Sequence, residues 1–279
     1  MKTVLITGAT GFLGKKITQS FLERGYKVIG TGHSEEKIKK FERSFGNIVP
    51  IYQIDISSDY YRIKNIIKEH SVNYIIHSAA LKHVGICENN PSRAVDVNIV
   101  GSQNIIKAAI ECDVENVIGI STDKAVNPSC TYGITKKIME EMLLEHNFGI
   151  FQGVNFLFST GSVLDIWDDL RNSNKPILVN KNAKRFFSSL EQVCNKIIES
   201  LDVRGIFSID ECYEISISDL QKAYAKYHNF FKHGEYIPLS VEKQEEDLSL
   251  KNIKINNLKT DEIVCLFENY YQKEDLIIE

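Results

Sequence analysis

The amino-acid sequence predicts an α/β protein with a Rossmann-like, doubly wound parallel sheet and a smaller C-terminal substrate-binding region. Three observations support this fold class. Residues 3–6 form a short β-rich run, a glycine-rich turn follows at once at 7–14, and strand-like and helix-like segments then alternate as far as Ile150. The alternation predicts a nucleotide-binding domain at 1–160 and a capping region at 161–279, with one strand near 205–209 that could return to the main sheet.

The glycine turn is the first element to carry chemistry. It reads Gly8-x-x-Gly11-x-x-Gly14 between a strand and a helix whose apolar stripe ends at Gly25, and the next strand spans 26–30. Such a turn lets the backbone approach a pyrophosphate, and the helix N-terminus offers it N–H groups and a positive dipole. The residues of this turn that we expect to bind a dinucleotide are Gly8, Thr10, Gly11, Phe12, Leu13 and Gly14.

The same periodicities assign the rest of the chain. Further strands of the sheet are expected at 51–54, 74–77, 117–120 and 151–158, and helices at 63–70, 90–112 and 132–146. In the looser C-terminal part, helices are expected at 165–172, 190–201 and 218–227, and a strand at 206–209. Right-handed crossovers place the loops 7–14, 78–84 and 121–132 along one edge of the sheet, where ligands of such sheets bind.

Tyr132 and Lys136 are the first catalytic candidates. They are four residues apart in a predicted helix, so their side chains lie on one face, one turn apart. An ammonium group beside a phenol stabilises the phenolate, which can then act as a base near neutral pH. The pair therefore predicts hydride chemistry at a carbinol.

Composition limits the other functions. The 279 residues are 43% apolar and 25% charged, with a formal net charge of −4, which predicts no nucleic-acid partner. Six scattered cysteines without a Cys-x-x-Cys pair indicate reduced thiols in a cytoplasmic protein, with no disulfide framework and no zinc site. His77 and His83 have no partner at metal-ligand spacing, so packed or hydrogen-bonded roles are expected. No signal peptide and no membrane span are recognised.

The segment after the second strand decides the cofactor. NAD enzymes of this fold hold the ribose diol with an acidic residue there, whereas this chain has His33, Ser34 and Lys37, with Glu35 expected in the next helix. These residues favour a 2′-phosphate, and hence NADP over NAD. Further cofactor-binding residues are expected on the adenine side (Asp55, Ile56) and on the nicotinamide side (Ser78, Ala79, Ala80, Lys82), and Asn98, Tyr132 and Lys136 are also expected to bind the cofactor.

Three groups of residues resemble the extended short-chain dehydrogenase/reductase family, and within it the inverting UDP-N-acetylglucosamine 4,6-dehydratases of bacterial surface-sugar biosynthesis. They are the glycine turn, the segment 80–101 with Glu88, Asn90 and Asn98, and most specifically Ser121–Pro128 leading to Tyr132 and Lys136. The match covers 1–145. Beyond it, Gln152 and Thr160 stand at two arginine positions of the family, while Asn155 is kept. The resemblance implies a homo-oligomer acting on a UDP-sugar, with substrate-binding residues at Leu81, Lys82, His83, Asn155, Arg185, Lys232 and Glu235.

The resemblance also implies roles for the catalytic residues. Tyr132 would take the C4 hydroxyl proton with help from Thr122 and Lys136, Lys124 would remove the C5 proton, and Asp123 would protonate the leaving C6 hydroxyl. This acid and base, adjacent in sequence, are expected to point apart. Two alternatives remain. The first is an NADPH-dependent 4-ketoreductase or 4-epimerase that needs only Thr122, Tyr132 and Lys136. The second is a non-catalytic NADP-binding regulator. The exact sugar and the C5 stereochemistry are left open.

Overall fold

The computed structural model describes residues 1–159, 161–236 and 253–275 of the chain. These residues form two compact units. The first holds Met1–Gly153 and Ser189–Ile209, and the second holds the described part of Val154–Ser188, 210–236 and 253–275. Each unit has its own sheet and its own hydrophobic core.

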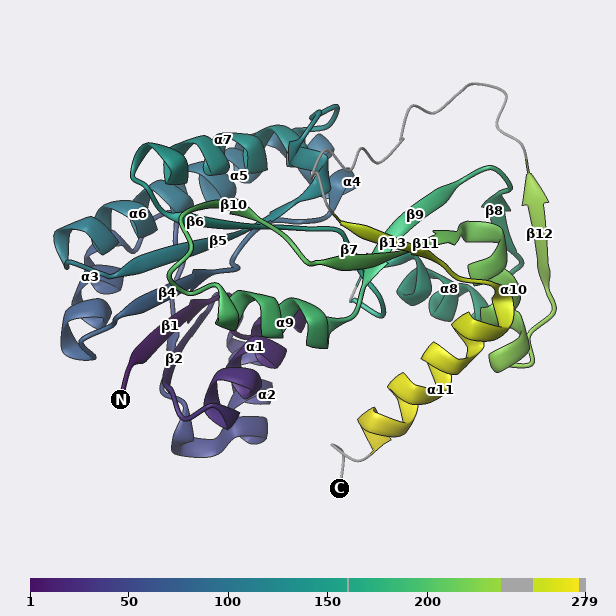
Figure 1. Cartoon of the computed structure of the whole chain (residues 1–279), viewed down its shortest axis with the longest axis horizontal. Coiled ribbons are helices and arrows are strands. Elements are labelled where there is room, and N and C mark those ends of the chain that lie inside the picture. The colour runs from purple at the N-terminus through teal and green to yellow at the C-terminus, as the bar shows by residue number, and fades with distance from the viewer. Residues whose placement is uncertain (160, 237–252, 276–279) are drawn as a thin grey trace. The chain divides into compact units, whose positions relative to one another are not determined.

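The first unit is built on a seven-stranded parallel sheet in the order β10-β6-β5-β4-β1-β2-β3 (Figure 1). Its strands are β1 (Thr3–Thr7), β2 (Lys27–Gly32), β3 (Ile51–Gln53), β4 (Tyr74–His77), β5 (Asn116–Thr122), β6 (Gly149–Gly153) and β10 (Gly205–Phe207). The order reverses between β1 and β4, which confirms the predicted doubly wound, Rossmann-like class. Strands buried on both faces read as continuous apolar runs, which is why they could be recognised.

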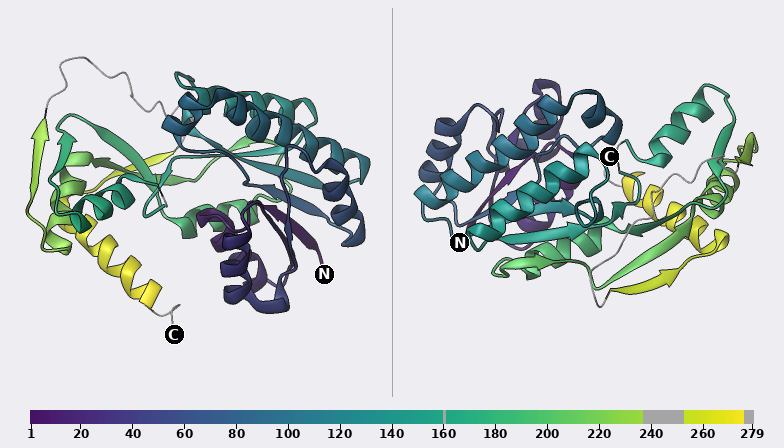
Figure 2. Two further views of the ribbon diagram at one scale, coloured as in Figure 1. Left: turned by 180° about the vertical axis from the view of Figure 1, so that it is seen from behind. Right: turned by 90° about the horizontal axis from the view of Figure 1, so that it is seen from above.

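Helices cover both faces of this sheet (Figures 1 and 2). They are α1 (Phe12–Glu23), α2 (Glu35–Phe45), the short η1 (Gly46–Ile48), α3 (Tyr60–Glu69), α4 (Val84–Asn89), α5 (Pro91–Val95), η2 (Asp96–Val100), α6 (Gly101–Glu111), η3 (Asp123–Ala125), α7 (Thr131–Glu145) and α9 (Leu190–Glu199). The core between the sheet and α3, α6 and α7 is formed by fully buried side chains such as Leu5, Ile75, Ile105 and Leu143. Burying each such side chain contributes about 1.5–3 kcal/mol.

The helix predicted at 90–112 is interrupted. Residues Asp96–Val100 form a π-helical turn between α5 and α6, and this turn carries Asn98. A single continuous helix was therefore the wrong prediction for this stretch. The apolar period of about 3.6 residues does not reveal a π turn, because such a turn shifts the helix register by only one residue. Turns of this kind often occur at functional sites.

The boundary between the units also differs from the predicted one. The first unit ends at Gly153 and not at residue 160, and Ser189–Ile209 rejoin it instead of belonging to the second region. In this segment α9 acts as the crossover that lets β10 pair in parallel with β6, from Gly205 against Gly149 to Phe207 against Phe151. A parallel pair requires such a crossover, so the helix must return together with its strand.

The second unit contains a four-stranded sheet in the order β13-β11-β9-β7 and the parallel pair β12-β8. Its elements are β7 (Asn155–Phe156), α8 (Val163–Asn172), β8 (Ile177–Asn180), β9 (Lys184–Ser188), β11 (Glu211–Ser216), α10 (Ile217–Tyr227), β12 (His233–Tyr236), β13 (Lys254–Asn257) and α11 (Thr260–Asp275). Trp167, Tyr224, Phe187 and Phe267 are the largest buried side chains of its core. Within the described ranges, no helix combines the length and the apolar character needed to cross a membrane.

Candidate active site

The glycine turn has the shape required for a pyrophosphate. Gly8 has φ +67°, and a Cβ there would lie 2.9 Å from the Cα of Ala79. A Cβ on Gly14 would lie 2.2 Å from the Gly8 carbonyl oxygen, so only glycine lets α1 begin this close to β1. The N-cap of α1, Gly11, contributes no side-chain hydrogen bond, so no cap side chain covers the donors of its first turn. The turn therefore fits a dinucleotide phosphate on the ground of its own geometry.

The end of β4 lies against this turn. Ser78 Oγ donates a hydrogen bond to the Thr7 carbonyl oxygen at 2.7 Å, and the Ala79 amide donates to Thr7 Oγ1 at 3.2 Å. The small side chains of Ser78, Ala79 and Ala80 allow this close approach of the two strand ends. The structure thus brings together two loops that were predicted to share one edge of the sheet.

The end of β5 presents the second group of predicted residues. Asp123 is 5% exposed, and its Oδ1 accepts hydrogen bonds from Thr122 Oγ1 (2.7 Å), the Lys124 amide (3.0 Å) and Lys124 Nζ (3.2 Å). Asp123 Oδ2 is buried and has no hydrogen-bond partner among the described residues. The expectation that Asp123 and Lys124 point apart is wrong, because the short η3 turn folds the lysine back onto its neighbour as an ion pair.

Tyr132 and Lys136 lie in the first half of α7. The N-terminus of this helix is held from α4, because Glu88 accepts hydrogen bonds from the Thr131 amide at 2.6 Å and the Thr131 hydroxyl at 3.0 Å. Burial raises the pKa of Tyr132, and the charge of Asp123 raises it further. Burial lowers the pKa of Lys136 to about 7, against an opposing effect of Glu140. The predicted fall in the pKa of Tyr132 is therefore not what this structure shows, because burial and the charge of Asp123 both raise it.

Behind this helix lies a buried carboxylate that the sequence did not single out. Glu140 is 1% exposed, and its Oε1 accepts hydrogen bonds from Ser121 Oγ (2.6 Å) and Gln152 Nε2 (2.9 Å). Lys137 Nζ is 3.7 Å from its other oxygen. Gln152, at a position where the resembled family has arginine, thus faces the catalytic helix. No local pattern marks Glu140, because acidic residues in helices are usually solvated.

His77 connects the glycine turn to α7 through a chain of buried hydrogen bonds. Thr7 Oγ1 contacts His77 Nδ1 at 2.8 Å, and His77 Nε2 contacts Ser102 Oγ at 2.9 Å. Ser102 donates to the Asn98 carbonyl at 2.7 Å, so it accepts from His77, which fixes the proton on Nε2. The packed, hydrogen-bonded role predicted for His77 is confirmed.

The chain of hydrogen bonds continues from the π turn to Tyr132. Asn98 Oδ1 accepts from the Leu81 amide at 2.8 Å, and Asn98 Nδ2 donates to the Leu81 carbonyl and to Thr135 Oγ1, both at 3.0 Å. Thr135 Oγ1 in turn donates to the Tyr132 carbonyl at 2.8 Å. Asn98 was predicted to bind the cofactor, but its amide is occupied by these protein partners, so we assign it a positioning role.

The stability of the first unit should fall in mild acid because of His77. Burial and the nearby Lys136 lower the pKa of this imidazole to about 3, whereas it is near 6.5 in the unfolded chain. The unfolded state therefore binds a proton on His77 that the folded state does not bind. The free energy of unfolding is at its full value above pH 6.5 and decreases as the pH falls towards 3. The expected loss between pH 7 and pH 5 is about 2 kcal/mol. Urea unfolding measures it. A His77→Asn variant should show a shallower pH dependence, the exposed His146→Gln variant an unchanged one, and equal slopes in all three would contradict the prediction.

Gly133 holds the two halves of the candidate active site together. A Cβ at this position would lie 2.3 Å from the carbonyl oxygen of Lys124, so the alanine variant must push the Asp123–Lys124 turn away from α7. We expect Gly133→Ala to lower turnover about 10²-fold with the secondary structure intact. Gly85→Ala is the matched control, since a Cβ on Gly85 meets no atom within 4 Å. Turnover assays with circular dichroism make the comparison, and equal activity of the two variants would refute this role.

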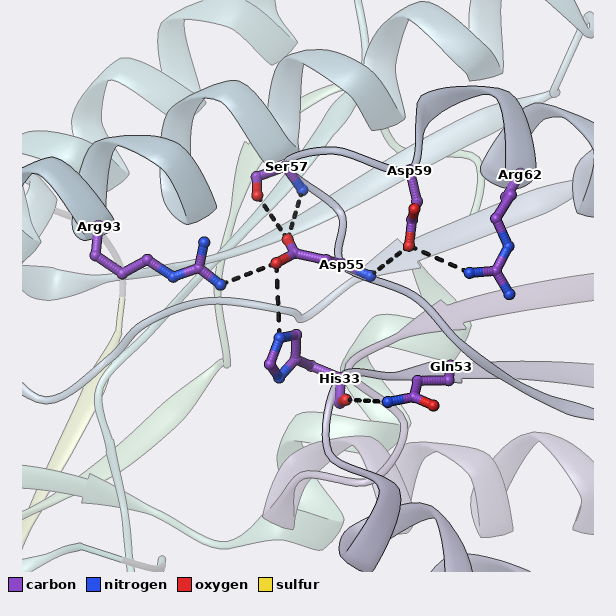
Figure 3. A network of polar contacts seen from close by, with 7 residues as sticks. All are labelled: His33, Gln53, Asp55, Ser57, Asp59, Arg62 and Arg93. Atoms are coloured by element: carbon purple, nitrogen blue, oxygen red, sulfur yellow. Dashed lines mark hydrogen bonds and ion pairs between the residues drawn. The ribbon is translucent and has the colours of Figure 1, made fainter.

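The loop after β2 departs in part from its prediction. Ser34 caps α2 by accepting from the Lys37 amide at 3.4 Å, and Lys37 itself is exposed. Glu35 pairs with Lys39 at 2.6 Å along α2, so in this structure it does not reach back towards the ribose side. His33 instead lies beside Asp55, with 3.6 Å between Nε2 and Oδ2 (Figure 3). Ile56, the other predicted adenine neighbour, is a core residue packed against Gly101.

The predicted substrate-binding residues are divided between the two units. In the first unit, Leu81 bonds to Asn98, Lys82 is exposed, and His83 is the half-buried N-cap of α4. In the second unit, Asn155 donates to the Phe186 carbonyl at 3.0 Å and Arg185 to the Lys184 carbonyl at 2.7 Å. Lys232 is exposed just before β12; the side chain of Glu235 and all of Thr160 lie outside the described residues.

The sheet, the glycine turn and the Tyr132–Lys136 helix together define a Rossmann-fold protein of the short-chain dehydrogenase/reductase class. Residues 4–264 match the family model described as "Polysaccharide biosynthesis protein", and the chain belongs to this family. It includes nucleotide-sugar dehydratases and epimerases. The chain is 32% identical over 241 residues to a UDP-N-acetylglucosamine 4,6-dehydratase (inverting) of Campylobacter jejuni subsp. jejuni serotype O:2, covering 80% of this chain and 71% of that protein.

Two further known proteins are similar to this chain, one in sequence and one in structure. A UDP-glucose 4-epimerase of Rickettsia rickettsii is 30% identical over 204 residues, covering 68% of this chain and 59% of the relative. The X-ray structure of Pen from Bacillus thuringiensis superposes with a TM-score of 0.86 at 27% identity, covering 96% of this chain and 98% of Pen. The chain spans 40 to 71% of the length of the curated relatives it matches.

Proposed function

We propose that the protein is an NADP-dependent UDP-N-acetylglucosamine 4,6-dehydratase that inverts C5. One observation carries the proposal: the buried Asp123 is paired with Lys124 directly beside the Tyr132–Lys136 helix, and its Oδ2 has no hydrogen-bond partner among the described residues. A buried carboxylate oxygen without a partner costs free energy, which a substrate hydroxyl at that position would recover. The Campylobacter relative supports the choice of reaction.

The tyrosine half of the site serves the C4 carbon. NADP, when bound, supplies the hydride acceptor for C4 and the hydride donor for C6. Tyr132 takes the proton of the C4 hydroxyl, and Lys136 supplies positive charge as the phenolate forms. The hydroxyl of Thr122 turns from Asp123 to donate a hydrogen bond to the same C4 oxygen. Burial lowers the pKa of Lys136 to about 7, and the charge of Glu140 opposes this fall and so favours the ammonium form.

The Asp123–Lys124 pair serves C5 and C6. Lys124 Nζ donates a hydrogen bond to Asp123 Oδ1 at 3.2 Å, so a proton of the ammonium group can pass to the carboxylate. Moving that proton from Lys124 to Asp123 produces a neutral amine and a carboxylic acid, the two forms that elimination requires. Lys124 then removes the C5 proton, acidified by the C4 ketone, and Asp123 protonates the C6 hydroxyl, which leaves as water. A proton returns to C5, so the net change is the loss of one water molecule.

A second candidate is epimerisation or reduction at C4, which the rickettsial relative favours. This chemistry needs Thr122, Tyr132 and Lys136 but neither Asp123 nor Lys124. It predicts that the buried ion pair only shapes the turn. The two candidates therefore differ in what the pair does.

Incubation of the purified protein with UDP-N-acetylglucosamine, without added cofactor, tests the proposal. Formation of a 4-keto-6-deoxy product supports dehydration. A C4 epimer, or NADPH consumption only when the keto sugar is supplied, would sink it in favour of the second candidate. A cytoplasmic location and a homo-oligomeric state belong to the same proposal; the six free cysteines suit a reducing compartment.

A further inference from the structure

Three polar side chains from separate segments, Asp55, Arg93 and His33, meet beyond the ends of β2 and β3 (Figure 3). Asp55 Oδ2 is 3.0 Å from Arg93 Nη2, which comes from α5, and 3.6 Å from His33 Nε2, which follows β2. The side chain of Asp55 is 26% exposed, those of Arg93 and His33 are 44% and 70% exposed. This edge of the sheet is where the adenosine end of a dinucleotide lies in a Rossmann fold.

Asp55 is a permanent anion at this edge. Its Oδ1 accepts hydrogen bonds from the Ser57 amide at 3.0 Å and the Ser57 hydroxyl at 2.6 Å. Partial burial raises the pKa of Asp55, but the hydrogen bonds from Ser57 and Arg93 outweigh burial and lower it to about 2. An uncompensated carboxylate here would repel the phosphate of a 2′-phosphorylated ribose bound close by.

Arg93 compensates the negative charge of Asp55 and keeps further N–H donors for a ligand. A guanidinium carries five N–H donors, and among the described residues Arg93 uses only Nη2, on Asp55. The contact fixes the planar group at the edge of the sheet, where its other N–H groups can form charge-assisted bonds to phosphate. In the segment directly after β2, Glu35 is paired with Lys39 and so does not supply the ribose-binding carboxylate that is expected at this position of an NAD site.

We propose that Arg93, acting with His33, determines the preference of this site for a 2′-phosphorylated adenine nucleotide. The inference rests on the proposed nucleotide site and adds its specificity residue. No motif pointed to Arg93, since it lies in the first turn of a helix far along the chain from the β2 loop.

Isothermal titration with 2′,5′-ADP and 5′-AMP tests the inference, because these two probes differ only in the 2′-phosphate. We expect the unaltered protein to bind 2′,5′-ADP more tightly. Arg93→Met should weaken 2′,5′-ADP about 10-fold or more and 5′-AMP less than about 3-fold, as expected for the loss of one or two charge-assisted hydrogen bonds. Arg93→Lys, which keeps a point charge, should lie between. Thermal melting confirms that the variants fold.

Arg62→Met is the matched control. Arg62 belongs to the same network but comes from α3, where it pairs with Asp59 at 3.4 Å (Figure 3). It should bind both probes like the unaltered protein. Equal losses for both probes in Arg93→Met, no loss for either, or no 2′-phosphate preference in the unaltered protein would each overturn the inference. If the unaltered protein binds neither probe, the proposed nucleotide-binding site is refuted, and the inference about its specificity is refuted with it.

Discussion

Replacing Tyr132 by phenylalanine is expected to lower turnover about 10³-fold and to leave cofactor affinity within about 3-fold. The substitution removes one hydroxyl and keeps the ring that packs at the start of α7. General base catalysis contributes about 10²–10⁴ to rate. A loss of about 10³-fold lies in the middle of this range. Burial and Asp123 raise the pKa of Tyr132, so the phenolate must be stabilised by its surroundings when the base acts.

Steady-state assays with UDP-N-acetylglucosamine measure the loss, and nucleotide titration measures the affinity. Tyr61→Phe is a suitable control, because Tyr61 is 78% exposed and lies on α3. The control should keep full activity. If Tyr132→Phe retained more than about a tenth of the turnover, the assignment of Tyr132 as the base would be wrong.

Asp123→Asn is expected to block elimination about 10²-fold or more and to leave C4 oxidation possible. Asparagine can keep the oxygen that accepts from Thr122 and from the Lys124 amide, so the η3 turn should persist. It cannot donate a proton to the leaving hydroxyl, and it cannot take the proton that Lys124 must lose before acting as a base. The reaction should then stop after hydride transfer.

The signature of this block is reduced cofactor without a 4-keto-6-deoxy product, followed by absorbance and by mass spectrometry of the sugar nucleotide. Asp113→Asn provides the control. Asp113 is exposed and has φ +53°, a left-handed conformation that asparagine accepts readily. An Asp123→Asn protein that forms product at the normal rate would eliminate the acid role and favour C4 epimerisation.

The parts of the candidate active site that could be predicted from the sequence are those whose residues lie close together along the chain. The glycine turn could be recognised from its spacing because Gly8, Gly11 and Gly14 lie within one strand–turn–helix unit; its approach to Ala79 joins distant segments and could not be read in this way. The Tyr132–Lys136 pair could be placed on one helix for the same reason. Contacts such as Glu88 to Thr131, or Gln152 to Glu140, join distant segments and leave no periodic signal.

The fold class of the first unit and the set of polar residues at the carboxyl edge of its sheet can be read from the amino-acid sequence, since they follow from local periodicity and from the handedness of crossovers. The roles of those residues depend on contacts that form only in the folded protein. In the structure, Asp123 is paired with Lys124, and the Asn98 side chain bonds to protein groups such as the Leu81 amide. The strand β10 pairs with β6 of the first unit, and Arg93 contacts Asp55. The physical reason is that burial and long-range hydrogen bonds set the charge and direction of a side chain, and packing alone decides which distant groups supply them.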